Sequence, residues 1–127
     1  MTRPWDLSPD GSRLAILANF QQDLVNRDGA RIRLVSLANG ATKDLVVAGA
    51  HNLCAADWSA AGDALLVCSY TTAGTVLLRV NLEGEAKPLW PGRLSILGTK
   101  AVPSPDGRHL AFADWSIESN AWVLEGF

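Results

Sequence analysis

The stretch LSPDGSRLAIL, residues 7–17, decides the fold because the chain repeats it twice. The counterparts are WSAAGDALLVC at 58–68 and PSPDGRHLAFA at 103–113, so the turn serines are separated by 51 and 45 residues. In the first and third copies Pro presets φ, Asp accepts hydrogen bonds from its own downstream backbone, and Gly takes a positive φ. Each copy therefore predicts a tight turn that leads into a short apolar strand.

A second motif recurs further along each repeat. It reads VSLANG at 35–40, VNLEG at 80–84 and WVLEG at 122–126, and its glycines are separated by 44 and 42 residues. Blades of four antiparallel strands repeat at about 40–50 residues. The two motifs together predict three blade-like units.

Every repeat divides into strands at regular spacing, and no amphipathic helical stretch interrupts them. We expect eleven strands, grouped as four, four and three. The short runs after the turns are apolar throughout and predict strands buried on both faces. A sandwich of stacked β-hairpins is the alternative. The expected strands include 53–58 as a first strand, 14–17, 65–68 and 110–113 as second strands, 32–37, 76–82 and 121–124 as third strands, and 43–47 and 87–90 as fourth strands.

The pattern Ser-Pro-Asp-Gly-x-x-Leu-Ala at 8–15 and 104–111 resembles the TolB-like β-propeller repeat, a relative of WD repeats. The second repeat departs from it, because Ala60-Ala61 replaces Pro-Asp. Residues 102–112 together with 119–122 look like the last blade of such propellers in large bacterial sensor or regulatory proteins. The resemblance implies the C-terminal three blades of a propeller that usually has six. It also implies a module that binds proteins or ligands, and some such propellers gate a fused peptidase.

The fold class is therefore all-β, a propeller fragment in a single domain covering 1–127. The expected blades are 1–49, 50–97 and 98–127, the last one strand short. Propellers close with roughly 4–8 blades, so three blades leave an open arc with two apolar faces. Two copies would supply six blades, which predicts a homodimer that closes one ring. A fragment of a longer propeller is the alternative, and it is compatible with dimerisation.

Composition bounds the function classes. The 127 residues are 48% hydrophobic and 19% charged, with a formal net charge of −2, which describes a globular domain. No basic stripe indicates a nucleic-acid partner. No apolar run approaches the roughly 20 residues that cross a bilayer, so no membrane partner is expected. The first residues lack the apolar region of a signal peptide, which leaves the cytoplasm, or the periplasm with a longer chain, as the location.

The cysteines and the tryptophans lead to specific expectations. Cys54 and Cys68 lie seven residues on either side of Ala61, so they would face each other across a regular hairpin. A cross-strand disulfide is geometrically demanding, and the favoured interpretation is a pair of small buried apolar side chains, with the disulfide left open. The tryptophans in or near strands are expected in the blade core: Trp5, Trp58, Trp90 and Trp122.

Ligands of propellers commonly sit where the loops between second and third strands meet the loops between blades. The longest of these, at 19–28, stretches the first repeat and is a candidate binding loop. His109 follows a turn directly and is expected on the surface. Each candidate also has an ordinary structural interpretation as a solvated or packing residue. The ligand-binding candidates are Gln21, Asp23, His51, Asn52, Arg93, Trp115 and Glu118.

No catalytic motif stands out in the sequence. A Gly-x-Ser-x-Gly elbow, a His-Glu-x-x-His pair and a P-loop are all absent. Asp10 and Asp106 suggest calcium, but an Asp-Gly turn accounts for both without a metal. We therefore expect no catalytic residue, metal or cofactor, and a module for self-assembly and for binding peptide, protein or small ligands. The alternative is the propeller domain of an enzyme, peptidase or glycan-active, with its active site on the channel face. A repeat fragment without a function of its own is the third.

Overall fold

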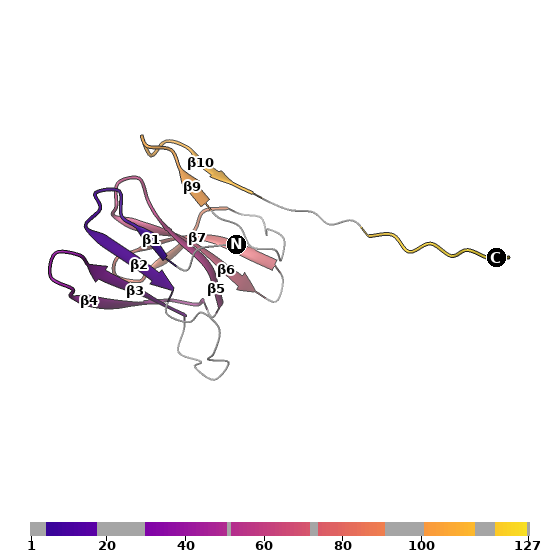
Figure 1. The fold of residues 1–127 in the computed structure, drawn as a ribbon, viewed down its shortest axis with the longest axis horizontal. Coiled ribbons are helices and arrows are strands. Elements are labelled where there is room, and N and C mark those ends of the chain that lie inside the picture. The colour runs from indigo at the N-terminus through magenta and orange to yellow at the C-terminus, as the bar shows by residue number, and fades with distance from the viewer. Residues whose placement is uncertain are drawn as a thin grey trace.

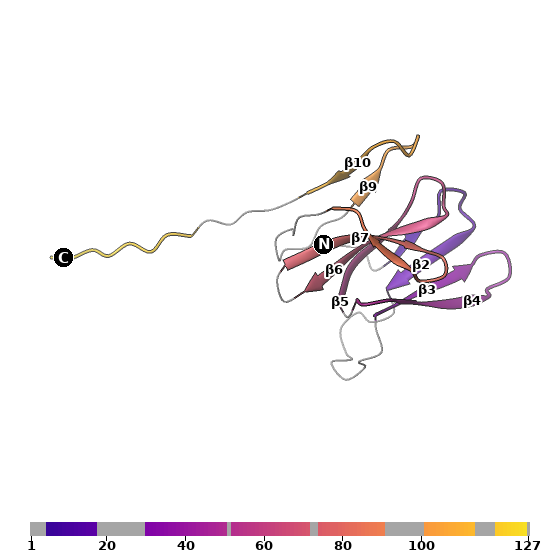
Figure 2. The ribbon, with the colours of Figure 1, turned by 180° about the vertical axis from the view of Figure 1, so that it is seen from behind.

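The computed structural model describes residues 5–17, 30–50, 52–71, 74–90, 101–113 and 119–126. These residues form ten strands and no helix, arranged in three separate antiparallel sheets. The first sheet has the order β1-β2-β3-β4 and lies beside the second in both views (Figures 1 and 2). Its strands are β1 (Trp5–Leu7), β2 (Arg13–Leu17), β3 (Ala30–Ser36) and β4 (Thr42–Val47).

The second sheet repeats the topology of the first, with the order β5-β6-β7-β8. The third sheet contains two described strands, which pair as one hairpin. The strands of the second sheet are β5 (Asn52–Trp58), β6 (Ala64–Thr71), β7 (Gly74–Asn81) and β8 (Ala86–Pro88), and those of the third are β9 (Ala101–Pro103) and β10 (Leu110–Phe112). An up-and-down sheet of four strands is the form of a propeller blade.

The three turns that suggested the repeat share one hydrogen-bond pattern. The Ser8 amide donates to the Arg13 carbonyl at 2.8 Å, and the Gly11 amide donates to the Ser8 carbonyl at 2.8 Å. The corresponding bonds are present at Ser59 and at Ser104. The turn glycines have φ values of 72°, 68° and 71°, the left-handed region that glycine adopts without steric cost. The predicted turn chemistry is confirmed.

A carboxylate completes each turn, although its position shifts in the second repeat. Asp10 accepts from the Ser8 hydroxyl at 2.6 Å and from the Ser12 amide at 3.0 Å. Asp106 accepts in the same way from Ser104 and from the Arg108 amide. The second repeat has Ala61 at that position, and Asp63 instead accepts from the Ser59 hydroxyl at 2.8 Å. The turn therefore survives the loss of Pro-Asp.

The hairpins after these turns share one register. Asp6 pairs with Ala15, Asp57 with Leu66, and Val102 with Ala111. Because side chains alternate between the two faces of a strand, equivalent residues lie on equivalent faces. We call the side that carries Leu7, Leu14 and their equivalents the front face, and the side that carries Asp6, Ala15 and their equivalents the back face.

The sheets pack back face onto front face. The main core lies between the first and second sheets, where back-face residues of the first meet front-face residues of the second. Ala50 also belongs to this cluster. The other buried members are Ala15, Leu17, Ile32, Leu34, Leu45 and Val47 from the first sheet, and Ala56, Trp58, Leu65, Val67 and Val80 from the second. The same arrangement recurs when Leu66 and Leu77 of the second sheet pack against Ala101 of the third, with Leu110 and Phe112 beside it.

Burial on both faces is confirmed for β6 and wrong for β2 and β10. Residues 64–69 of β6 are all buried, because a neighbouring sheet covers each side. Among the described residues, nothing comparable covers the front face of the first sheet or the back face of the third. Their strands accordingly keep partly exposed residues.

The expected third strand at 121–124 does not form. Residues 119–126 contain no strand and run as an extended chain away from the sheets (Figures 1 and 2). Trp122 is 89% exposed. The core assignment of the tryptophans holds for Trp58 alone, since Trp5 and Trp90 are each 45% exposed. Trp5 lies on the open front face, and the Trp90 ring contacts Phe112.

The cysteines are buried, as expected, but the favoured interpretation without a cross-link is wrong. Cys54 and Cys68 form a disulfide, with 5.3 Å between their Cα atoms. The β5–β6 register shifts between Leu53 and Ala55. Cys54 is the extra residue at this irregularity, next to Ala55, which pairs with Cys68 on the opposite strand. Such cross-links persist in oxidising compartments.

The carboxylate of the first turn predicts a pH dependence of stability. The Ser8 hydroxyl, followed by the Ser12 amide and hydroxyl, lowers the pKa of Asp10 from 3.8 to about 2. Between these values the unfolded chain binds more protons than the folded one, so stability falls as pH is lowered from about 4 to about 2. We expect the urea midpoint of an Asp10→Asn variant to fall less over this window than that of the parent chain.

Urea unfolding followed by tryptophan fluorescence at pH 5 and pH 2.5 measures the effect. Glu83→Gln, which removes one carboxylate from another exposed turn, is the matched control. Equal losses in the parent and in Asp10→Asn would contradict the role of the Asp10 carboxylate.

Candidate interaction surface

Most of the predicted ligand-binding residues fall outside the described part of the chain. Gln21, Asp23, His51, Arg93, Trp115 and Glu118 all lie there. Asn52 begins β5 and is exposed, and its carbonyl accepts from the Ser69 hydroxyl at 3.2 Å. The Ala30 amide donates to the Ala50 carbonyl at 2.8 Å, which joins the start of β3 to the connection between the first two sheets. Asn52 therefore lies at the end of the sheets opposite the serine turns, as expected.

The described ranges contain neither a metal-holding cluster nor a membrane-spanning helix. No group of three or more His, Cys, Asp or Glu side chains there is placed to hold a metal ion. No helix in the same ranges is long and apolar enough to span a membrane. His109 is exposed, as expected, and its amide donates to the Ser104 hydroxyl at 3.0 Å.

Polar contacts from the first sheet lock the edge of the main core. The Asp6 carboxylate accepts from the Trp58 amide at 3.0 Å, and the Trp58 indole Nε1 donates to the Asp6 carbonyl at 3.2 Å. The guanidinium of Arg13 lies 4.7 Å from the centroid of the Trp58 ring and donates to the Gly62 carbonyl at 2.7 Å. A cation stacked on an indole adds attraction beyond buried area. Asp6 and Arg13 thus fix how one sheet follows the next.

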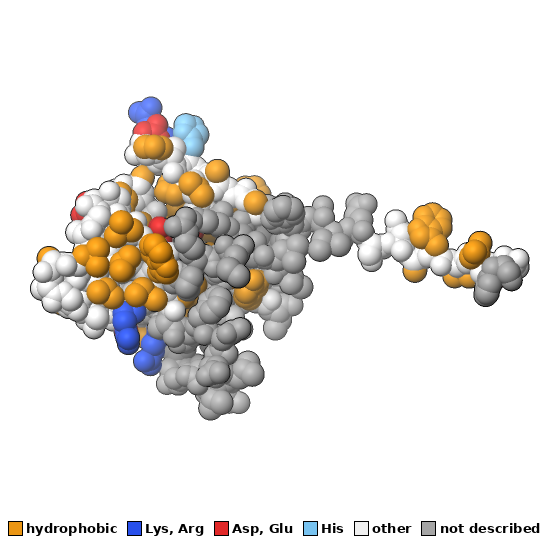
Figure 3. Space-filling view, in the orientation of Figure 1, with side chains coloured by type: hydrophobic (Ala, Val, Ile, Leu, Met, Phe, Trp, Pro, Cys, Tyr) orange, Lys and Arg blue, Asp and Glu red, His pale blue; other side chains and the backbone are white. Residues whose placement is uncertain are grey.

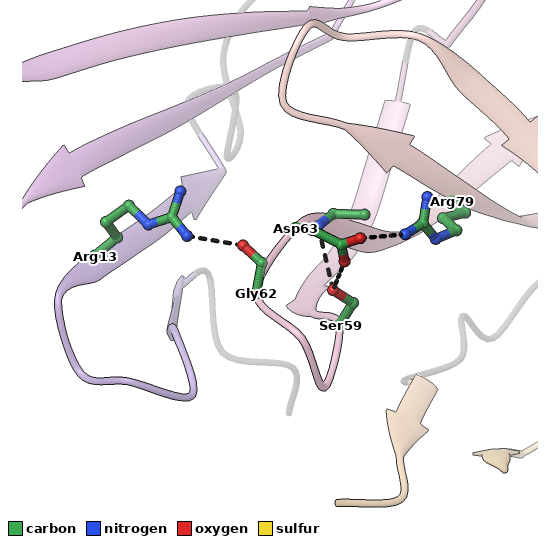
Figure 4. A network of polar contacts seen from close by, with 6 residues as sticks. Arg13, Ser59, Gly62, Asp63 and Arg79 are labelled. Atoms are coloured by element: carbon green, nitrogen blue, oxygen red, sulfur yellow. Dashed lines mark hydrogen bonds and ion pairs between the residues drawn. The ribbon is translucent and has the colours of Figure 1, made fainter. Parts of the chain in front are cut away.

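Figure 4 shows the second serine turn held from two sides. Arg13 reaches its Gly62 carbonyl from the first sheet, and Arg79 of β7 pairs with Asp63 at 3.0 Å. Asp63 also accepts from Ser59, whose hydroxyl is the largest cause of the lowered pKa of this carboxyl. The turn therefore serves as a contact point between sheets as well as a connection within one.

The loop between β7 and β8 makes a second contact with β4. Lys43 Nζ donates to the Leu82 carbonyl at 2.9 Å. Gly84 has φ of 94°, and a Cβ there would collide with the Val46 carbonyl oxygen. Glycine is therefore required at this position, because the two backbones approach closely.

The front face of the first sheet is an exposed apolar surface. Trp5, Leu7 and Val46 are 45%, 43% and 44% exposed. Hydrophobic side chains gather over β1 and β2 in the space-filling view, with basic side chains along one border (Figure 3). Leu14, Ile16 and Val35 lie between them and are partly buried. We call these residues the open front face: Trp5, Leu7, Leu14, Ile16, Val35 and Val46.

The open front face matches the face by which the second sheet packs on the first. The shared registers make Trp58 the equivalent of Leu7, Leu65 of Leu14, and Val67 of Ile16. All three second-sheet residues are buried in the main core. The sequence assigned Trp5 to a core because this tryptophan lies in or near an expected strand. The open front face is thus an uncovered copy of an interface that the chain uses internally.

An ion pair lies beside this apolar surface. Arg33 pairs opposite both Ile16 and Asp44, and its Nε donates to the Asp44 carboxylate at 2.8 Å. The Arg33 guanidinium lowers the pKa of Asp44 below its ordinary value. The pair is exposed, so its own contribution to stability is small. It places both signs of charge on the front face itself, because Arg33 lies across the sheet between Ile16 and Asp44.

A pocket of about 310 Å³ opens between the second and third sheets, at the turn end. Its lining includes Leu66, Arg79, Pro103 and Leu110. We call the contact between the first and second sheets the first junction, and the contact between the second and third sheets the second junction. By the shared register, Pro103 occupies the place at the second junction that Trp58 holds at the first. Ala64 is the equivalent of Arg13, because each residue directly follows the serine turn of its sheet. The second junction therefore lacks the large stacked pair that Arg13 and Trp58 form at the first junction. The smaller Ala64 and Pro103 leave space there, which accounts for the pocket.

Comparison with known proteins supports the fold. No model of a known protein family matches the chain. The chain is 30% identical over 115 residues to lipoprotein LpqB of Mycobacterium ulcerans (strain Agy99), covering 91% of this chain and 17% of the lipoprotein. The crystal structure of TolB from Acinetobacter baumannii matches with a TM-score of 0.66 at 19% identity, over 92% of this chain and 27% of TolB. The chain therefore has a TolB-like, propeller-type repeat fold, as the turns predicted, and spans less than a third of either protein.

The junction contacts predict the effect of removing one carboxylate. Asp6→Ala leaves the buried Trp58 amide without its acceptor, and a hydrogen bond to a charged group contributes about 1.5–3 kcal/mol. We expect the free energy of unfolding to fall by about this amount. Asp6→Asn keeps an oxygen acceptor and should lose clearly less. Urea denaturation measures both, and equal losses in the two variants would contradict the assignment.

Proposed function

We propose that the chain is a non-catalytic propeller-type module for protein binding and self-assembly, in which two copies form one six-bladed ring. The observation that carries the proposal is the open front face, because the second-sheet equivalents of its Leu7, Leu14 and Ile16 are buried in the main core. Apolar patches of this kind on soluble proteins mark interaction sites. The surface is shaped for the back face of another blade, because that is what the equivalent face contacts within the chain.

A second copy is the partner we propose for this surface. The same chain carries the complementary feature, an exposed back face on the third sheet, where Val102 is 52% exposed and Ala111 is exposed beside it. Three units per chain and two copies supply six blades, within the range of roughly 4–8 at which propellers close. A head-to-tail contact that closes forms a ring and leaves no free end.

The loop end of the ring is the proposed site for a peptide or protein ligand. The contact residues we propose there are Gln21, Asp23, His51, Asn52, Arg93, Trp115 and Glu118. Support comes from the topology, which places Asn52 and the starts of β3 and β5 at the same end of the sheets. Residues at loop ends on a rigid scaffold are well suited to binding.

The mass of the particle in solution tests self-assembly. We expect light scattering coupled to size exclusion to give about twice the 13.6 kDa of one chain. Leu7→Lys places a charge within the open front face and should shift the protein to a monomer, because a buried unpaired charge is strongly unfavourable.

Leu37→Lys is the matched control, since Leu37 is 50% exposed but lies in the turn after β3, off the open front face. This variant should keep the mass of the parent chain. A parent chain that stays monomeric at high concentration would overturn the proposed self-assembly.

Peptide selection tests the loop end separately. Peptides selected on the parent chain should lose at least roughly tenfold in affinity for a Trp115→Ala/Glu118→Ala variant, which corresponds to about 1.4 kcal/mol. Their affinity for Arg108→Ala, at the turn end, should be unchanged. Selected peptides that respond to Arg108 and ignore the loop-end pair would contradict this site.

A further inference from the structure

The serine turns of adjacent sheets lie close to one another. A Cβ on Gly62 would lie 3.6 Å from Cδ of Pro9, and a Cβ on Gly107 would lie 3.7 Å from Cβ of Ala60. The glycines of the second and third turns therefore lie close to the second residue of the preceding turn. Figure 4 shows the second of these turns facing Arg13 of the first sheet. We call this series of neighbouring serine turns the ladder. Its two turn-to-turn distances are nearly equal, so the ladder indicates how a further sheet would be placed on the stack.

The ladder has two uncovered ends. A Cβ on Gly11, in the first turn, would have no atom within 4 Å among the described residues. Pro105, the second residue of the third turn, is exposed. These positions are equivalent to the two sides of a contact that occurs twice inside the chain. Within the described residues, Gly11 and Pro105 therefore lack the turn-to-turn neighbour that their equivalents have.

We propose that the third sheet of one copy docks on the open front face of a second copy, so that Pro105 of one chain lies over Gly11 of the other. This inference rests on the proposed self-assembly and specifies its geometry. Val102 then lies against Leu7, in the places that Asp6 and Trp58 occupy at the first junction. The same contact occurs twice in a closed pair, related by the two-fold axis.

The chemistry of this junction differs from the first in a defined way. The lock formed by Asp6 with Trp58 is replaced by two apolar side chains, Val102 and Leu7, which are 52% and 43% exposed in the single chain. His109 stands where Arg13 stands at the first junction, directly after its turn and exposed. The contact between copies therefore depends on apolar burial, whereas the contact within the chain adds polar bonds.

A cysteine cross-link tests the geometry. In the full chain, Gly11→Cys with Pro105→Cys should form disulfides between copies under mild oxidation, because the equivalent Cβ separation of 3.7 Å within the chain matches disulfide geometry. The matched control is Ala60→Cys with Gly107→Cys, which places cysteines at the internal contact and should cross-link within one chain. Both variants put cysteine at a glycine with nearly the same φ, 72° and 71°, so their strain is comparable.

The readouts are non-reducing electrophoresis and the mass in solution. A covalent two-chain band for the first variant, with the control remaining a one-chain band without free thiols, supports the proposal. A two-chain mass without that covalent band overturns the docking geometry but leaves self-assembly standing. A one-chain mass overturns both, and a ladder of longer polymers overturns closure by two copies.

A second cysteine pair keeps the proposal testable if cysteine at Gly11 prevents folding. Leu7→Cys with Val102→Cys changes no residue with positive φ and should give the same two-chain band. Absence of cross-linking in both pairs, in protein that is folded and has the two-chain mass, contradicts the proposed contact.

Discussion

A sheet that is apolar on both sides needs a covering layer on each side, and this requirement governs the whole molecule. β6 satisfies it: residues 64–69 are buried because the first sheet covers one face and the third sheet covers the other. The back faces of the first and second sheets carry small and aliphatic residues that meet the front face of the next sheet. Burial of apolar area at about 25 cal/mol per Å² makes this stacking the main source of stability. Every exposed apolar residue at the two ends of the stack follows from the same rule.

The turns show how far the sequence alone specified this arrangement. A Ser and a Gly at fixed spacing predicted the hairpins, because few other residues satisfy a turn with positive φ. The hydrogen bonds of Ser8, Ser59 and Ser104 confirm that prediction. The register did not follow: spacing around Ala61 placed Cys54 opposite Cys68 in a regular hairpin, whereas in the structure Cys68 pairs with Ala55. The compensating role of Asp63 was missed, because it lies two positions after the aspartate of the other copies.

What the sequence misjudged depended on contacts between distant segments. The pattern placed Trp5 in a core, because an apolar residue before a turn reads the same whether or not another sheet covers it. Residues 121–124 matched the third-strand motif, yet in the structure they are extended and exposed. The disulfide of Cys54 and Cys68 depends on a register shift at the end of β5, which single-residue spacing does not reveal. Among the candidate ligand contacts only Asn52 is placed by the structure, so that part of the site remains a proposal argued from topology.

Hydrogen exchange at two protein concentrations tests the central claim, that the open front face is an uncovered blade interface. The account predicts that amides of residues 5–17 become more protected as concentration rises, because a second copy covers β1 and β2. Amides of residues 58–67, whose equivalent face is already covered within the chain, should exchange at the same rate throughout. Concentration-independent exchange in residues 5–17 would contradict the claim.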